Sequence, residues 1–167
     1  SPEVDVRFAT LCHDLGKALT PADLLPRHIG HDKRGHEPIQ DLCERLRVPV
    51  DCRELALMAC REHILIHRSR ELRPDTLVDL FLRCDALRRP ERFAWLVEVC
   101  RADAQGREGY ANAGYPQATY LRDMLATAAS IDAGAIARAC LDKSRIADAV
   151  LAARVAAVRQ MHLSAKG

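Results

Sequence analysis

Histidine and aspartate stand side by side near the start of the chain, in the segment TLCHDLGK at residues 10–17. His13 and Asp14 have apolar neighbours, and a carboxylate is costly to bury there unless a cation or hydrogen bonds compensate it. Neighbouring residues on a helix point about 100° apart, so these two can hold one ion only where the helix ends. The pair therefore indicates either part of a metal or acid/base site, or a core histidine bonded to a helix-terminal aspartate.

Six of the seven histidines occur within the first 67 residues: His13, His28, His31, His36, His63 and His67. The middle three lie on an expected glycine-containing loop, where imidazoles either approach a substrate or are simply solvated. The last two are four residues apart and share a helix face, a spacing that suits one ion or phosphate but also arises by chance. Combined with an adjacent aspartate, this crowding favours a divalent ion that activates water against phosphorus.

A second carboxylate, Asp85, is expected on the apolar side of a helix over residues 74–87. An unpaired carboxylate is not expected in such a place. It either faces the end of the helix that carries His13 and Asp14, or pairs with Arg88 or Arg89.

Helical periodicity dominates the chain and predicts an all-α helical bundle. The expected helices cover residues 6–15, 38–47, 51–67, 74–87, 90–105, 116–130, a stretch after 132, and 144–161. Gly16 is expected to end the first helix as its C′ residue, and Asp51 to cap the third. The glycine-rich segment 106–117 is the expected linker, which divides the chain into a domain at 1–105 and a helical tail at 106–167.

The composition is that of a folded globular protein, with 49% apolar and 29% charged residues. No apolar run approaches the ~20 residues that span a bilayer, and no segment resembles a secretion signal, so we expect a cytoplasmic protein without a membrane partner. The seven cysteines form no CxxC pair, which favours reduced core residues over a zinc–thiolate site. A net charge of +2 neither demands nor excludes a nucleic-acid partner.

An ordered series of motifs resembles the HD-domain phosphohydrolases. The series is LCHDLGK, then HxxH and GHxP on the loop, then REH, then CDALRRPERF, and it covers residues from about Val6 to Arg107. More narrowly it is similar to the C-terminal HD domain of the bacterial multifunctional CCA family of tRNA nucleotidyltransferases. The later segment GYPQATYLRDML resembles that family's DYPQ segment.

The resemblance implies metal-dependent phosphohydrolase chemistry, as a 2′,3′-cyclic phosphodiesterase, a 2′-nucleotidase and a phosphatase. The implied metal is nickel or magnesium, with manganese, cobalt and zinc as alternatives. The implied partners are the tRNA 3′ end or 2′,3′-cyclic and 2′ nucleotides, and a homodimer is compatible with the sequence.

The resemblance also implies roles for individual residues. The implied metal ligands are His13, Asp14 and Asp85, with Asp103 as a rival to Asp85. The implied catalytic residues are His13, Asp14, Lys17, His36 and His63. The implied phosphate- or RNA-binding residues are Arg34, His67, Arg68, Arg88 and Arg89.

The sequence departs from the family pattern in one important respect, since that pattern begins with a separate histidine and none precedes His13. We therefore expect that the HD domain lacks its first helix here, and that this chain alone is weak or inactive. One rival hypothesis is a helical tRNA-positioning module with a vestigial metal site, whose arginines hold the RNA backbone. A weaker rival is a nucleotidase that acts on free nucleotides.

Overall fold

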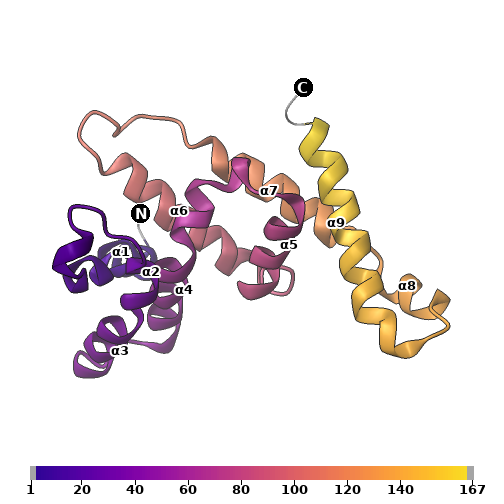
Figure 1. Cartoon of the computed structure of the whole chain (residues 1–167), viewed down its shortest axis with the longest axis horizontal. Helices are drawn as coiled ribbons and strands as arrows, with labels where there is room; N and C mark the ends of the chain where they lie inside the picture. The colour runs from indigo at the N-terminus through magenta and orange to yellow at the C-terminus, as the bar shows by residue number, and fades with distance from the viewer. Residues whose placement is uncertain (1–2, 165–167) are drawn as a thin grey trace.

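The computed structural model describes residues 3–164, and every regular element within this range is helical (Figure 1). The α-helices are α1 (Val4–Cys12), α2 (His31–Arg34), α3 (His36–Arg45), α4 (Val50–His67), α5 (Pro74–Arg83), α6 (Pro90–Gln105), α7 (Pro116–Ala129), α8 (Ala133–Ala139) and α9 (Ile146–Ser164). Short 3-10 turns cover Leu15–Leu19, Ala22–Leu24, Ser69–Glu71 and Lys143–Arg145. The all-α class predicted from the sequence is confirmed. Within the same range, no helix is both long and apolar enough to cross a membrane.

Helices α1, α4 and α6 pack against one another and form the part of the core that carries the site. Their contacting faces bury small side chains completely, for example Ala9 of α1, Ala59 of α4 and Val99 of α6. Small residues allow helix axes to approach closely, so the ends of these three helices lie near one another. His13 directly follows α1, His63 lies in the last turns of α4, and Asp103 lies in the last turn of α6.

The first helix ends earlier than expected, and Gly16 has a different role from the predicted C′ residue. Gly16 lies inside the 3-10 turn Leu15–Leu19. A Cβ atom at this position would lie 2.0 Å from the carbonyl oxygen of His31 and 2.6 Å from the amide nitrogen of Gly35. Glycine is therefore required because the backbone around α2 touches this turn directly. This contact brings His31 to the end of α1.

Two further helix ends differ from the expectation. The N-cap residue of α4 is Pro49, so Asp51 lies in the first turn and caps nothing, although its charge suits the helix dipole there. Helix α5 ends at Arg83 because Asp85 adopts a left-handed conformation with φ 52°. The amide of Ala86 then donates to the carbonyl of Phe81 at 2.8 Å, which is a Schellman ending.

The C-terminal helices pack against the rest of the bundle. Helix α9 contacts both α5 and α7, and its Val158 is completely buried. In Figure 1, α8 and the start of α9 lie at the opposite end of the molecule from α1 to α3. The segment between α6 and α7 is tied back by Gln105, whose Nε2 donates to the carbonyl of Ala113 at 2.9 Å. The domain boundary at residue 105 stays a prediction.

Candidate metal centre

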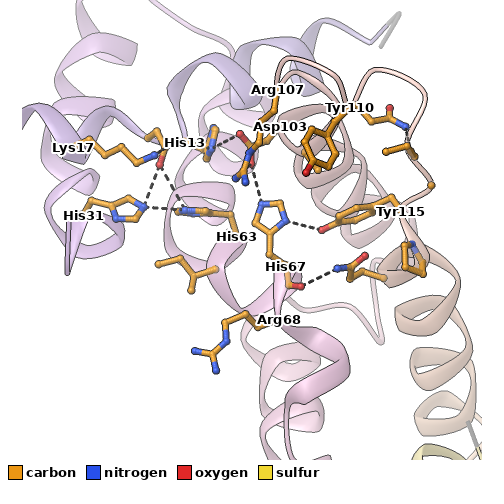
Figure 2. A pocket seen from close by; sticks show the side chains of 18 residues that line it. His13, Lys17, His31, His63, His67, Arg68, Asp103, Arg107, Tyr110 and Tyr115 are labelled. Carbon is orange, nitrogen blue, oxygen red and sulfur yellow. Dashed lines mark hydrogen bonds and ion pairs between the residues drawn. The ribbon is translucent and has the colours of Figure 1, made fainter. Parts of the chain in front are cut away.

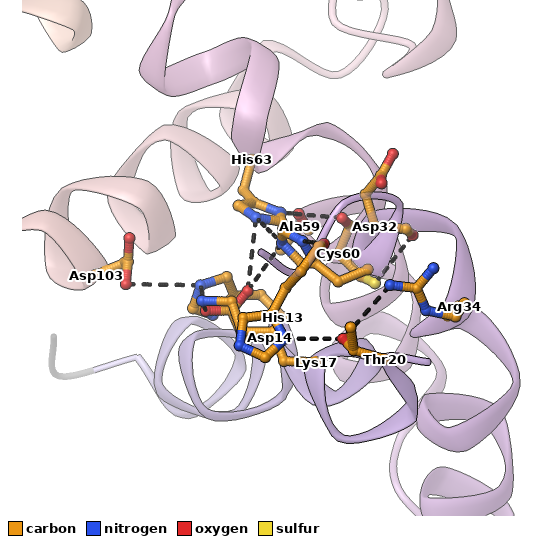
Figure 3. A network of polar contacts seen from close by, with 12 residues as sticks. His13, Asp14, Lys17, Thr20, Asp32, Arg34, Ala59, Cys60, His63 and Asp103 are labelled. Atoms are coloured by element: carbon orange, nitrogen blue, oxygen red, sulfur yellow. Dashed lines mark hydrogen bonds and ion pairs between the residues drawn. The ribbon is translucent and has the colours of Figure 1, made fainter. Parts of the chain in front are cut away.

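Three histidines converge on the carboxylate of Asp14 (Figures 2 and 3). The Nε2 atom of His13 lies 3.3 Å from Asp14 Oδ2. The Nε2 atoms of His31 and His63 lie 3.1 and 3.7 Å from Asp14 Oδ1. His13 and His63 are both 5% exposed, so the cluster is mostly shielded from solvent. The histidine–aspartate pair thus lies at a helix end, as the sequence predicted, and meets two imidazoles from α2 and α4.

The opposite nitrogen of each ring is held by the backbone. The Nδ1 atom lies 2.8 Å from the Thr10 carbonyl in His13, 2.7 Å from the His28 carbonyl in His31, and 3.0 Å from the Ala59 and Cys60 carbonyls in His63. A carbonyl oxygen only accepts, so each Nδ1 carries a proton that it donates. In a neutral imidazole the lone pair is then on Nε2, and all three lone pairs point toward the Asp14 carboxylate. This arrangement is the one that metal-ligating histidines adopt.

A divalent cation fits this set of ligand atoms. Ligand atoms of His13, Asp14 and His63 all lie within 4.8 Å of one another. The Nε2 atoms of His13 and His63 are 3.3 and 3.7 Å from the Asp14 oxygens, separations that one ion can bridge with bonds of about 2.0–2.2 Å. His13 Nε2 and Asp14 Oδ1 are buried and make no aligned hydrogen bond to any described residue. Lone pairs that face a carboxylate without aligned donors are electrostatically unfavourable, and a cation would relieve this.

The electrostatic environment keeps two of the ligands, Asp14 and His63, in the charge states that metal binding requires. Burial alone would raise the pKa of Asp14, but contacts with His13 and Lys17 outweigh it and hold that pKa well below its usual range. Burial lowers the pKa of His63, and the nearby His13 lowers it further. At neutral pH Asp14 is therefore a carboxylate and His63 a neutral imidazole. Burial opposes protonation of His13, yet its contacts with Asp14 and Thr10 raise its pKa.

Asp103 of α6 is the second carboxylate of the cluster. Its Oδ1 lies 3.6 Å from His13 Nε2, and its Oδ2 lies 3.1 Å from His67 Nε2. The contact with His67 is the main reason that the pKa of Asp103 is lowered. Asp103 was the rival to Asp85 in the sequence, and it is the one that faces His13.

The structure does not bring Asp85 to this cluster, which corrects the expected ligand set. Asp85 forms the left-handed turn after α5, and its carboxylate lies 3.8 Å from both Arg88 and Arg89. The alternative ion pair is therefore the arrangement found. These two arginines lie with Asp85 and not around the histidine cluster, so the structure does not bring them to the expected phosphate site.

The histidine cluster forms one end of a pocket of about 570 Å³ (Figure 2). Lys17, Arg68, Arg107 and Tyr110 line it together with residues of the cluster. A pocket of this size is in the range that holds a nucleotide-sized ligand. Its walls come from α4, the end of α6 and the segment that precedes α7.

The chain is similar to multifunctional CCA proteins of several bacteria. The chain is 56% identical over 153 residues to the multifunctional CCA protein of Chromobacterium violaceum. It is 58% identical over 152 and 156 residues to those of Laribacter hongkongensis and Cupriavidus metallidurans. These alignments cover 91–93% of this chain. The chain is related to the C-terminal part of the multifunctional CCA proteins.

The chain spans 38% of the length of these multifunctional CCA proteins. No family model matches it. No solved structure matches it either.

The other residues singled out in the sequence are divided between the pocket and the surface. Lys17, His63, His67 and Arg68 line the pocket. His36 is exposed at the start of α3 and is not brought to the site. Arg34 donates to the carbonyl of Ile29 at 2.8 Å, which orders the loop and does not place it in the pocket.

Sequence reasoning did not select two residues that the structure places at the site. His31 was indistinguishable from its loop neighbours His28 and His36, because spacing alone does not reveal how a loop folds. Tyr115, whose hydroxyl lies 3.0 Å from His67 Nδ1, stood in the GYPQ segment that resembled the family. That segment was the available signal, although it gave no role for the tyrosine.

Proposed function

We propose that this chain is the metal-dependent phosphohydrolase part of a CCA-adding tRNA nucleotidyltransferase. Its proposed substrates are 2′,3′-cyclic phosphodiesters, 2′-nucleotides and phosphate monoesters, including those at a tRNA 3′ end. The observation that carries the proposal is the convergence of three imidazole lone pairs and two carboxylates at one end of a nucleotide-sized pocket. The similarity to multifunctional CCA proteins supports it.

His13, Asp14 and His63 would hold the ion, with His31 and Asp103 beside them. A set rich in imidazole favours nickel, cobalt or zinc over magnesium and manganese, which prefer oxygen ligands. When bound, such an ion would lower the pKa of a water molecule and draw electron density from the phosphate.

The cationic residues of the pocket provide the contacts that a phosphate requires. The Lys17 ammonium contacts Asp14 and is 43% exposed, so it lies between the cluster and the open pocket. It is therefore placed to bind phosphate oxygens next to the ion. Arg68 and Arg107 at the rim are 65% and 68% exposed and add positive potential that attracts an anionic substrate.

The decisive experiment measures hydrolysis of 2′,3′-cyclic AMP with added Ni²⁺, Mn²⁺ or Mg²⁺, alongside calorimetric titration with the metal alone. We expect metal-dependent turnover that Asp14→Asn reduces by at least about 100-fold, since a ligand and a charge are lost. Asp75→Asn is the matched control, because Asp75 pairs with Arg73 and does not line the pocket.

The opposite outcome is absence of both turnover and metal binding in the unmodified chain. Binding of tRNA that weakens steeply with salt would then support the alternative function, a helical tRNA-positioning module with a vestigial metal site. The exposed Arg68 and Arg107 would be its first contacts to test.

A further inference from the structure

His67 lies one helical turn after His63 but does not face Asp14. Its ring bridges two other side chains (Figure 2). Its Nε2 lies 3.1 Å from Asp103 Oδ2, and its Nδ1 lies 3.0 Å from the Tyr115 hydroxyl. His67 therefore connects a carboxylate of the metal cluster to the segment that leads into α7.

The hydrogen-bonding pattern gives His67 the opposite tautomer from the three histidines around Asp14. The Asp103 carboxylate only accepts, so it favours the tautomer of His67 whose Nδ1 carries the lone pair and accepts from the Tyr115 hydroxyl. The proton of the neutral ring is then on Nε2, where it faces the Asp103 carboxylate. His67 thus turns an N–H toward Asp103 in a close contact that is not an aligned hydrogen bond, whereas His13 presents a lone pair.

The segment that carries Tyr115 is anchored at two further points. The Nε2 of Gln117 donates to the backbone carbonyl of His67 at 3.0 Å. The Nε2 of Gln105 donates to the carbonyl of Ala113 at 2.9 Å. The segment is therefore fixed to the last residue of α4 and the last residue of α6, which are the helices that carry His67 and Asp103.

Asp103 has few other restraints. Its remaining ion-pair contacts are His13 at 3.6 Å and Arg107 at 3.7 Å, and the Arg107 side chain is 68% exposed. A mobile surface arginine restrains a carboxylate weakly. His67 is the closest of the three groups, and its other ring nitrogen is held by the Tyr115 hydroxyl.

We propose that Tyr115 and His67 are positioning residues that hold Asp103 at the metal centre, so that the segment before α7 is part of the phosphohydrolase site. The role of Asp103 toward a metal rests on the proposed function. The chain of contacts from Tyr115 through His67 to Asp103, here called the relay, does not. In known metal sites, residues that orient a ligand typically contribute 10- to 100-fold to affinity.

The test is a calorimetric titration of the chain with Ni²⁺ in the unmodified form and in Tyr115→Phe, His67→Ala and the double variant. We expect the dissociation constant to rise about 3- to 10-fold in Tyr115→Phe and about 10- to 100-fold in His67→Ala. The double variant should bind as His67→Ala does, because the tyrosine acts only through the histidine.

The matched control is Tyr120→Phe. The Tyr120 hydroxyl also contacts the Nδ1 atom of a histidine, His162, but this pair links α7 to α9 and does not line the pocket. Its removal should leave Ni²⁺ affinity unchanged within about twofold. The proposal is overturned if Tyr115→Phe binds Ni²⁺ as the unmodified chain does. It is also overturned if Tyr115→Phe and Tyr120→Phe weaken Ni²⁺ binding equally.

A second readout separates this proposal from the proposed function. Nitrogen-15 chemical shifts of the His67 ring should show a protonated Nε2 and an unprotonated Nδ1 that accepts a hydrogen bond, and Tyr115→Phe should shift Nδ1. If the unmodified chain binds no Ni²⁺ but shows this pattern, the phosphohydrolase function fails while the relay stands. A protonated Nδ1 in neutral His67 would overturn the relay whatever the metal result.

Discussion

The Nε2 atoms of His31 and His63 face each other at 3.0 Å. Both rings donate from Nδ1 to backbone carbonyls, so in their neutral forms both Nε2 atoms carry lone pairs. Two lone pairs at this distance repel, and Asp14 Oδ1 adds negative charge 3.1 Å from one nitrogen and 3.7 Å from the other. A proton or a metal ion between these groups turns repulsion into attraction, so this point is where a cation gains most.

The first prediction concerns His31, the first residue of α2, and His36, the first residue of α3. His31→Ala should raise the Ni²⁺ dissociation constant at least about tenfold, because it removes a lone pair that faces the cluster. His36→Ala is the matched control and should not change it, since His36 is exposed outside the pocket. The shift of the melting temperature with added Ni²⁺ reports both affinities, because a ligand stabilises the form that binds it. Equal shifts in the two variants would contradict the geometry.

The second prediction distinguishes the two candidate aspartates. Asp103→Asn should weaken Ni²⁺ binding about 10- to 100-fold, because a neutral amide replaces a carboxylate 3.6 Å from His13. Asp85→Asn should have no effect on binding, since within residues 3–164 Asp85 pairs with exposed arginines, and asparagine tolerates the same left-handed turn. Its cost in stability should be about 1 kcal/mol or less. Calorimetry on both variants gives the comparison, and a larger loss in Asp85→Asn would reverse the assignment.

The two aspartates also show what the sequence could and could not predict. The all-α class and a site at His13 and Asp14 followed from periodicity and from residue types at a helix end. Periodicity also indicated the helix side on which Asp85 lies. It did not reveal that the helix ends at Arg83 and that Asp85 turns away in a left-handed conformation. Only tertiary packing determines that α6, and not α5, presents its last turn to His13.

The loop histidines were unpredictable for a different reason. His28, His31 and His36 have the same side chain and similar neighbours, so the sequence offered no basis for a choice. The choice is made by the contact between Gly16 and the backbone of His31 and Gly35, which seats α2 against the end of α1. Such long-range backbone contacts leave no periodic pattern.

The third prediction tests that contact. Gly16→Ala places a methyl group within 2.0 Å of a backbone oxygen, and neither side can move without displacing α2. Overpacking typically costs about 1–3 kcal/mol, and we expect the upper end because the clash is with backbone. Gly114→Ala has nothing within 4 Å and should change the free energy of unfolding by about 0.5 kcal/mol or less. Urea denaturation of both variants measures the difference. Similar free energies of unfolding would show that α2 does not depend on close backbone contact with Gly16.

The last prediction concerns Glu62, which neighbours His63 but faces away from the cluster and is 2% exposed. Arg83 of α5 donates to its two carboxylate oxygens at 3.1 and 3.0 Å, and Arg61 donates at 2.8 Å. Burial alone would raise the pKa of Glu62, but these arginines outweigh it and bring that pKa below 4.5. Because the pKa is lower in the folded state, the stabilisation is complete above pH 4.5 and is lost as pH falls through the folded value.

Glu62→Gln should therefore flatten the dependence of the unfolding free energy on pH below about 4.5, where the unmodified chain loses stability. Near neutral pH the substitution should cost about 3 kcal/mol, at the lower end for breaking a buried pair, because Arg83 is 43% exposed and regains solvent. Glu71→Gln is the control, since the Glu71–Arg68 pair is 65% exposed on both sides and should contribute little. Urea unfolding at several pH values gives both slopes. An unchanged slope in Glu62→Gln would show that other carboxylates govern the acid instability, and that the link between α4 and α5 does not depend on this charge.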